Sequence, residues 1–295
     1  LVLAYVGFVT LGLPDTVVGV AWPSVRETFN VSQSSLGMIF VMGGIGYLFS
    51  SFFSGKLQVR LGIGILLAAS SALVAASAFT FALAPMWLVF VAAALGHGLG
   101  SGAIDSGLNH YAAHHVSARH MNWLHASYSL GAMLGPLIMT NVIANTPSWR
   151  IGYATVAGIM VLMTTLSAFS HRRWDDARPV AGAETHALHG LIRTLRSGLV
   201  WLQVVIFFFY TGLEITVGQW SFTLLTESRG VGQEFAGYAV TGYWASIALG
   251  RGTVIDLGVC RLGQASAADR ERGCGENCQL HQYPPSKRSP GGEAT

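Results

Sequence analysis

Stretches of about 20 predominantly apolar residues recur along this chain, and they constrain its fold more than any other feature. Each is long enough to cross the hydrocarbon core of a bilayer, about 30 Å thick, as an α-helix. Charged residues make up 11% of the chain, against about a quarter in soluble domains. We therefore expect an all-α fold, a polytopic membrane helical bundle. The expected spans are residues 1–22, 35–54, 63–84, 86–111, 122–143, 149–170 and 198–224, with an eighth that begins near residue 235.

The length and continuity of these runs favour helices over a membrane β-barrel, whose strands are alternating segments of about ten residues. The distribution of Lys and Arg predicts the orientation, because basic residues are retained on the cytoplasmic side. The second, fourth and sixth loops hold eight of them, and the first, third, fifth and seventh hold three. The N-terminus is therefore expected in the cytoplasm. We expect no cleaved leader and no nucleic-acid partner, because the small basic excess reflects topology.

The order of apolar spans and basic loops divides the chain into three parts before its C-terminal tail. We expect a six-helix N-terminal half over residues 1–170, a basic cytoplasmic linker over 171–197, and the first two helices of a second half over 198–251. The end of the linker combines apolar and basic residues at helical spacing, which is typical of a helix lying on the membrane surface: Leu188, Leu191, Ile192, Arg193, Leu195 and Arg196.

The composition changes abruptly near Gly252. The last 44 residues carry ten charges and all three cysteines, whereas the first 251 residues carry 21 charges and no cysteine. The Gly, Pro and charged residues of 252–295 predict a disordered tail. Cys274 and Cys278 lie near His281, but no second pair of ligands follows at the spacing of a zinc site. We expect no metal site and no cofactor.

Three acids fall within the predicted spans: Asp15, Asp105 and Glu214. Counted from the helix ends at about 1.5 Å per residue, Asp15 and Asp105 lie near the middle of the bilayer. A charged side chain there costs about 2.5 to 3.5 kcal/mol, so such residues face a cavity or a partner and mark an ion or substrate path. Burial favours the neutral form of a carboxyl group. We expect Asp15 and Asp105 to take up and release protons; the alternative is a permanent hydrogen bond between helices.

Polar side chains near these acids are candidates for contacts with a solute. Asn109 follows Asp105 by four residues on the same helix face, and an amide beside an acid can hold hydroxyl groups. His125 and Tyr128 lie in a run of polar residues at helical spacing in the next span. For His125 a hydrogen bond between helices is an equal alternative, and we expect His97 to serve packing.

The segment GKLQVRLGIG, residues 55–64, lies between the second and third spans. It resembles the loop motif Gly-x-x-x-Asp-Arg-x-Gly-Arg of the major facilitator superfamily. Gly55, Arg60 and Gly62 match this cytoplasmic motif, whereas Val59 and Ile63 stand at the positions of the Asp and the second Arg. The charge network that this loop usually supplies is therefore incomplete here.

Three further features are similar to the fucose permease-like branch of proton-coupled sugar transporters. They are Asp15 in the first span, Asp105 followed by Asn109 in the fourth, and MNWLHASYSLGAMLGP at 121–136. The resemblance covers residues 1 to about 251. It implies the major facilitator fold of two six-helix halves, proton and substrate-linked roles for the two acids, and a multi-pass protein of a bacterial inner membrane.

The resemblance ends in the eighth span, just after Arg251. The remaining helices of a second half are not recognisable in 252–295, so we expect a truncated or frameshifted C-terminal part. A shifted frame from Thr253 permits Arg-Leu-Leu-Thr-Trp-Val-Phe-Ala-Asp, which looks like the missing segment. DNA sequencing that confirms the printed frame would exclude this explanation.

We expect a secondary transporter, not an enzyme, that takes up a sugar-like solute with protons by alternating access. Asn109, His125, Tyr128 and Glu214 are the expected solute contacts. Efflux of amphipathic small molecules is the alternative within the superfamily. A membrane enzyme is another alternative, because HYAAHH at 110–115 matches one histidine box of the di-iron lipid desaturases, but no second box completes such a site. The printed chain could also be an inactive fragment, with two of the last six helices.

Overall fold

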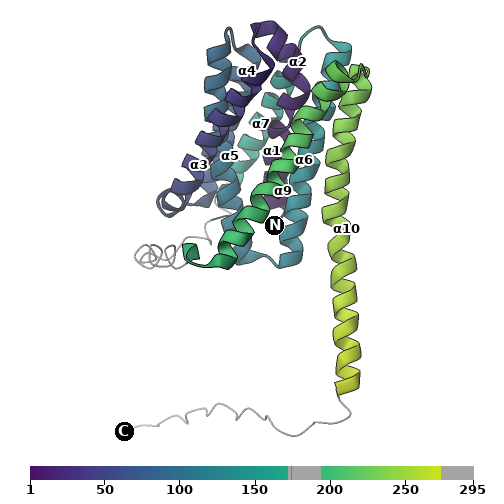
Figure 1. Ribbon diagram of the computed structural model, residues 1–295. Helices are drawn as coiled ribbons and strands as arrows, with labels where there is room; N and C mark the ends of the chain where they lie inside the picture. The colour runs from purple at the N-terminus through teal and green to yellow at the C-terminus, as the bar shows by residue number, and fades with distance from the viewer. Residues whose placement is uncertain (172–173, 175–193, 274–295) are drawn as a thin grey trace, which may run out of the picture. The chain divides into compact units, whose positions relative to one another are not determined.

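The computed structural model of the protein describes residues 1–171, 174 and 194–273. The chain divides into two compact units, residues 1–252 and 253–295. All regular secondary structure in the described residues is helical (Figure 1). The elements are α1 (Val2–Asp15), α2 (Val17–Phe29), η1 (Gln33–Ser35), α3 (Leu36–Leu61), α4 (Ile63–Leu83), α5 (Trp87–His115), α6 (Ala118–Asn145), α7 (Arg150–Ser170), α9 (Gly198–Thr223), η3 (Leu224–Ser228) and α10 (Gln233–Gly273).

Seven helical segments of the described chain are long and apolar enough to cross a membrane. They are Val2–Phe29, Gln33–Leu61, Ile63–Leu83, Trp87–His115, Arg119–Asn145, Arg150–Ser170 and Gly198–Ser228. The expected all-α membrane bundle is confirmed. The expected eighth span falls on α10, which is helical but not among these seven, because glycines, polar residues and Arg251 interrupt its apolar run.

The first span is longer than the predicted 1–22 and is broken in its middle. Pro14 cannot donate a backbone hydrogen bond, and α1 ends at the next residue, Asp15, with Thr16 between α1 and α2. The Thr16 hydroxyl donates to the carbonyl oxygen of Ala132 in α6 at 2.8 Å. The break therefore places Asp15 at a helix end inside the bundle.

The predicted loop over residues 55–62 is corrected by the structure. Nothing in GKLQVRL stops a helix, so α3 continues to Leu61, and Gly62 is the single residue between α3 and α4. Gly62 has φ 77° and ψ 154°, a conformation that is nearly exclusive to glycine. Gly55 and Arg60 lie on the exposed surface of α3.

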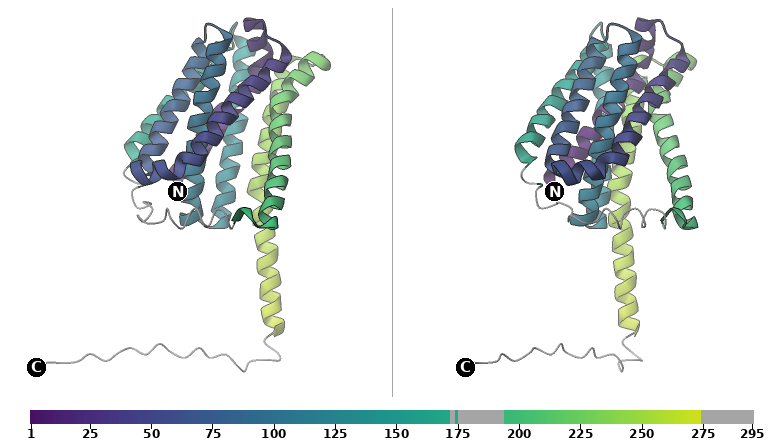
Figure 2. Two further views of the ribbon diagram at one scale, coloured as in Figure 1. Left: turned by 60° about the vertical axis from the view of Figure 1, so that its left-hand side comes forward. Right: turned by 90° about the vertical axis from the view of Figure 1, so that its left-hand side faces the viewer.

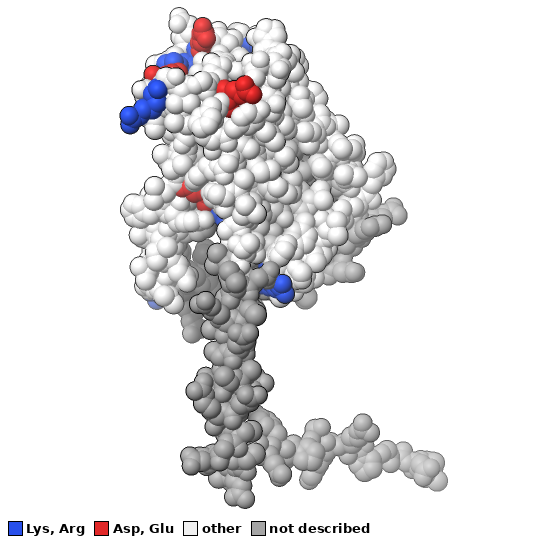
Figure 3. All heavy atoms as spheres, turned by 90° about the vertical axis from the view of Figure 1, so that its right-hand side faces the viewer, with Lys and Arg blue, Asp and Glu red and all other residues white. Residues whose placement is uncertain are grey.

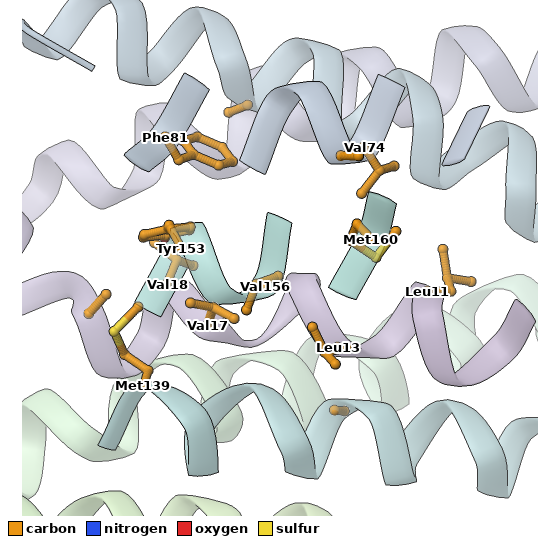
Figure 4. Packing of buried hydrophobic residues seen from close by; sticks show 14 of the residues in the cluster. Leu11, Leu13, Val17, Val18, Val74, Phe81, Met139, Tyr153, Val156 and Met160 are labelled. Carbon is orange, nitrogen blue, oxygen red and sulfur yellow. The ribbon is translucent and has the colours of Figure 1, made fainter. Parts of the chain in front are cut away.

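The first six spans pack as closely apposed pairs (Figure 2). The strongest pairings are α3 with α5, α4 with α7 and α5, and α1 with α6. Side chains from α1, α2, α4, α6 and α7 interdigitate between them, including Leu13, Val17, Phe81, Met139 and Tyr153 (Figure 4).

α9 follows the linker and packs chiefly on α2. Its only buried residues are Gly218, Gln219, Phe222 and Thr223, near its C-terminal end. There the Arg26 guanidinium of α2 forms an ion pair with Glu227 of η3 at 2.7 Å. On the face in Figure 3, charged side chains gather mainly near one end of the described surface, and its middle is largely uncharged, as contact with lipid requires.

Two predicted segments fall partly outside the described residues. Most of the linker, including Leu188, Leu191, Ile192 and Arg193, lies outside them, as do residues 274–295 with Cys274, Cys278 and His281. α10 runs through the expected boundary at Gly252 and ends at Gly273. The described part of the expected disordered tail is therefore helical.

Candidate functional site

A cavity of about 340 Å³ lies inside the first unit, bordered by the break in the first span. Most of its wall is apolar or aromatic, with a few polar groups. Its lining residues are Pro14, Asp15, Thr16, Val18, Ile39, Phe40, Gly43, Gly44, Tyr47, Phe81, Ala94, His97, Gly98, Ser101, Tyr128, Tyr153, Ile215, Gln219 and Trp244. They come from both sides of the linker, so the cavity lies between the N-terminal helices and the pair α9 and α10.

Asp15 projects into this cavity with both carboxylate oxygens engaged. Oδ1 lies 2.8 Å from Nε2 of His97 on α5, and Oδ2 accepts a hydrogen bond of 3.3 Å from the Tyr128 hydroxyl on α6. The Asp15 and His97 side chains are 27% and 17% exposed. His97, assigned to packing from the sequence, is thus a direct partner of the first buried acid.

The backbone at the break is held by Gln219 of α9. Its Nε2 donates to the main-chain oxygen of Asp15 at 2.8 Å. Gly19 allows this approach, because a Cβ at that position would lie 2.7 Å from Oε1 of Gln219. A proline-broken helix leaves main-chain groups that neighbouring helices must satisfy, and Gln219 of α9 satisfies one of them.

Asp105 lies behind the cavity wall and does not line it. Its Oδ2 accepts a hydrogen bond of 2.5 Å from the Tyr47 hydroxyl on α3, and its Oδ1 accepts one of 2.8 Å from Asn109 Nδ2. Tyr47 itself lines the cavity. The two acids therefore do not touch, but Tyr47 connects the hollow that holds Asp15 to the carboxylate of Asp105.

Three residues of the cavity lining each carry a buried polar atom that has no hydrogen-bond partner among the described residues: Ser101 Oγ, Gln219 Oε1 and Trp244 Nε1. These residues are 3%, 4% and 1% exposed. Unpaired buried polar groups cost about 1 to 3 kcal/mol each. All three atoms have almost no accessible surface, and two of them lie at helix contacts, Trp244 Nε1 against Gly218 and Gln219 Oε1 against Gly19.

The predicted solute contacts are only partly brought together. Of Asn109, His125, Tyr128 and Glu214, Tyr128 alone lines the cavity. Asn109 is turned to Asp105, and the His125 ring packs edge-on against Phe8 with centroids 5.3 Å apart.

Glu214 is engaged in an ion pair between α9 and α10. Nη2 of Arg251 lies 2.7 Å from its Oε2 and 3.0 Å from its Oε1. The same guanidinium donates to the Ser129 hydroxyl on α6 and to the Tyr210 hydroxyl, each at 2.7 Å. Glu214 thus belongs to a cluster that joins three helices, separate from the cavity lining.

Sequence reasoning missed Tyr47, His97, Ser101, Gln219 and Trp244. One signal was present: His97, Ser101, Asp105 and Asn109 follow one another at intervals of four, a polar stripe along one face of α5. For Gln219 and Trp244 no local pattern distinguishes them from packing residues. Across the described residues no group of three His, Cys, Asp or Glu side chains could hold a metal ion.

Comparison with known proteins matches residues 4–259 to the family model of the Major Facilitator Superfamily. The chain is 24% identical to Bypass of stop codon protein 6 of Saccharomyces cerevisiae, over 83% of this chain and 54% of that protein. It is 26% identical to sodium-dependent glucose transporter 1A of Mus musculus, over 85% and 67%, and 24% identical to sodium-dependent glucose transporter 1 of Homo sapiens, over 86% and 55%. The chain thus spans little more than half the length of two of these relatives.

The fold is similar to that of a crystal structure of a D-xylose-proton symporter, with a TM-score of 0.66 and 16% identity. The match covers 88% of this chain and 68% of that one. Seven apolar helices and this fold define an integral, multi-pass membrane protein. Because the family model extends over most of its length, the chain belongs to the Major Facilitator Superfamily.

Proposed function

We propose that this protein takes part in proton-coupled uptake of a small, neutral, sugar-like solute, which binds in the cavity beside Asp15. The observation that carries this proposal is the lining of that cavity, which places the Asp15 carboxylate and the polar side chains of His97 and Tyr128 beside aromatic surface. A polyhydroxy molecule has hydroxyl groups that donate to and accept from such polar side chains, and ring faces that pack on the aromatic ones.

Size and charge of the cavity support the same class of solute. Its volume of about 340 Å³ is at the lower end of the range for small-molecule sites, about 300 to 1,000 Å³. Phe40, Phe81 and Trp244 offer apolar surface for the faces of a sugar ring. Among the described residues that line the cavity there is no Lys or Arg, and the one carboxylate, on Asp15, already has two partners. This favours a neutral solute over an anion or a cation.

The proposed proton sites are Asp15 and Asp105. Their access to water alternates between the two sides of the membrane as the helices move. One proton moving inward across 100 mV provides about 2.3 kcal/mol. In this arrangement Tyr128 contacts both the cavity and Asp15, and the N-terminus is cytoplasmic. The same orientation puts Gly55 and Arg60 of α3, and Gly62 directly after it, on the cytoplasmic side.

Sodium coupling is the second candidate, because two of the relatives are named sodium-dependent glucose transporters. The contacts of Asp15 favour the proton: its neighbours are an imidazole nitrogen and a phenol, whereas a hard cation prefers a shell of oxygen ligands. Efflux of amphipathic molecules would need a wider apolar chamber than this one.

The histidine-box alternative is overturned by the family assignment, since members of this superfamily are transporters and not enzymes. His110, His114 and His115 lie on the exposed end of α5, where the His114 and His115 rings contact main-chain oxygens one turn earlier.

Binding to the 295-residue chain in lipid nanodiscs tests the proposal. D-glucose, D-xylose and L-fucose are titrated at pH 5.5 and pH 8 and with or without sodium, with tryptophan fluorescence and a pH indicator as readouts. We expect one sugar to bind with uptake of protons and without need of sodium. Gln219→Ala should weaken binding about tenfold, whereas Gln203→Ala, on the exposed face of the same helix, should not. Binding of none of the sugars, or binding that follows sodium and not pH, contradicts it.

A further inference from the structure

We infer that Tyr47 is the positioning residue that links solute in the cavity to the protonation of Asp105. The inference rests on the proposed function and adds a route by which one event affects the other. Tyr47 lines the cavity and donates to Asp105 at 2.5 Å, whereas Asp105 does not line the cavity. A solute in the cavity is therefore adjacent to Tyr47, and the Asp105 carboxylate lies behind that side chain.

The backbone holds this pair in register. A Cβ on Gly102, three residues before Asp105 on α5, would collide with the main-chain oxygen of Tyr47. A Cβ on Gly46 would likewise collide with the main-chain oxygen of Leu95. The Ser51 hydroxyl of α3 donates to the main-chain oxygen of Gly102 at 3.2 Å. Because α3 and α5 meet backbone to backbone at this level, the phenol has little freedom to move away from Asp105.

The hydrogen bonds differ between the two states of the acid. Ionised Asp105 accepts from Tyr47 on Oδ2 and from Asn109 on Oδ1, so the phenol hydrogen is committed to the carboxylate. When Asp105 takes one proton from water on Oδ2, its own O–H can donate to the Tyr47 oxygen. The phenol keeps its hydrogen and can turn it into the cavity to donate to a solute oxygen. The net change is one proton gained by Asp105.

The solute should therefore bind more tightly to the protein with protonated Asp105. By linkage, bound solute must favour protonation of Asp105 to the same extent. Such mutual stabilisation is the thermodynamic requirement for transporting the solute and the proton in the same direction.

Three ionisable side chains on neighbouring helices interact electrostatically with Asp105. They are Tyr47 of α3, His125 of α6 and Asp15 of α1. α4 has no ionisable side chain, and His97 is engaged with Asp15. Tyr47 is the one among them that touches both Asp105 and the cavity.

The test uses the 295-residue chain in nanodiscs with whichever of D-glucose, D-xylose and L-fucose it binds, and measures Kd at pH 5.5 and pH 8. Wild type should bind about tenfold more tightly at pH 5.5, as expected for one added hydrogen bond. Tyr47→Phe should bind weakly at both values. Asp105→Asn should bind tightly at both, because its amide N–H replaces the carboxyl proton as a donor to Tyr47. In the double variant Tyr47→Phe/Asp105→Asn, the tight binding expected for Asp105→Asn should be lost, because the phenol hydroxyl is absent.

Tyr153→Phe is the matched control, since Tyr153 lines the same cavity and should leave the pH dependence intact. A wild-type pH response that persists in Tyr47→Phe or in Asp105→Asn overturns the inference while the proposed function stands. Failure of the wild-type chain to bind any of the three sugars overturns both.

Discussion

Nε2 of His97 lies 2.8 Å from Oδ1 of Asp15, and this contact joins α5 to the helix break in the first span. Both side chains are less than one-third exposed. The pair places an imidazole beside a carboxylate where two apolar helical segments meet, in the lining of the cavity proposed for the solute.

Removing His97 should destabilise the protein. His97→Ala leaves a partly buried carboxylate with one fewer partner, which costs about 1 to 3 kcal/mol. Thermal unfolding in detergent should show a lower midpoint than for wild type. His114→Ala, at an exposed position of the same helix, is the control and should leave the midpoint unchanged. Equal midpoints for the two variants would show that the contact contributes no stability.

The Glu214–Arg251 pair should behave as a structural ion pair. Its side chains are 10% and 23% exposed, and loss of one partner from a buried pair costs about 3 to 5 kcal/mol. We expect Glu214→Gln to lower the unfolding midpoint strongly and the double variant with Arg251→Met to recover much of the loss.

The same variants separate this role from solute binding. Glu214→Gln should bind the sugar with the affinity of wild type, because Glu214 does not line the cavity. A large loss of affinity at an unchanged unfolding midpoint would restore Glu214 as a solute contact.

Close packing of α3 on α5 depends on Gly98. A Cβ there would collide with the main-chain oxygen of Gly43, and overpacking of this kind costs about 1 to 3 kcal/mol. Gly98→Ala should lower the unfolding midpoint. Gly158→Ala, where a Cβ meets nothing within 4 Å, should raise it slightly through helix propensity. A neutral Gly98→Ala would mean that the helices can separate at no cost.

The two glycines of the α3–α4 motif should respond in opposite ways. Gly62 has φ 77° and ψ 154°, so Gly62→Ala should cost about 1 to 3 kcal/mol of backbone strain. Gly55 lies within α3 with nothing within 4 Å of its Cβ position, and Gly55→Ala should be neutral or stabilising by up to about 1 kcal/mol. Thermal unfolding of both variants decides this, and equal losses would contradict the assigned backbone role of Gly62.

The sequence by itself determined the class of fold, the number of apolar helices to within one, and which acids fall inside apolar helical segments. These properties depend on local composition, since the length of an apolar run and its flanking charges are read along the chain. It did not determine where helices end without a breaker, as α3 shows by continuing to Leu61.

Only the tertiary structure decided which partner each buried group has. His97 and Asp15 are 82 residues apart and Gln219 and Asp15 are 204 apart, and such pairs depend on how each helix is rotated against its neighbours. Glycine-mediated contacts set that rotation, as Gly98 does against Gly43. Helical periodicity places residues on a common face of one helix, but it does not specify which face of another helix lies opposite.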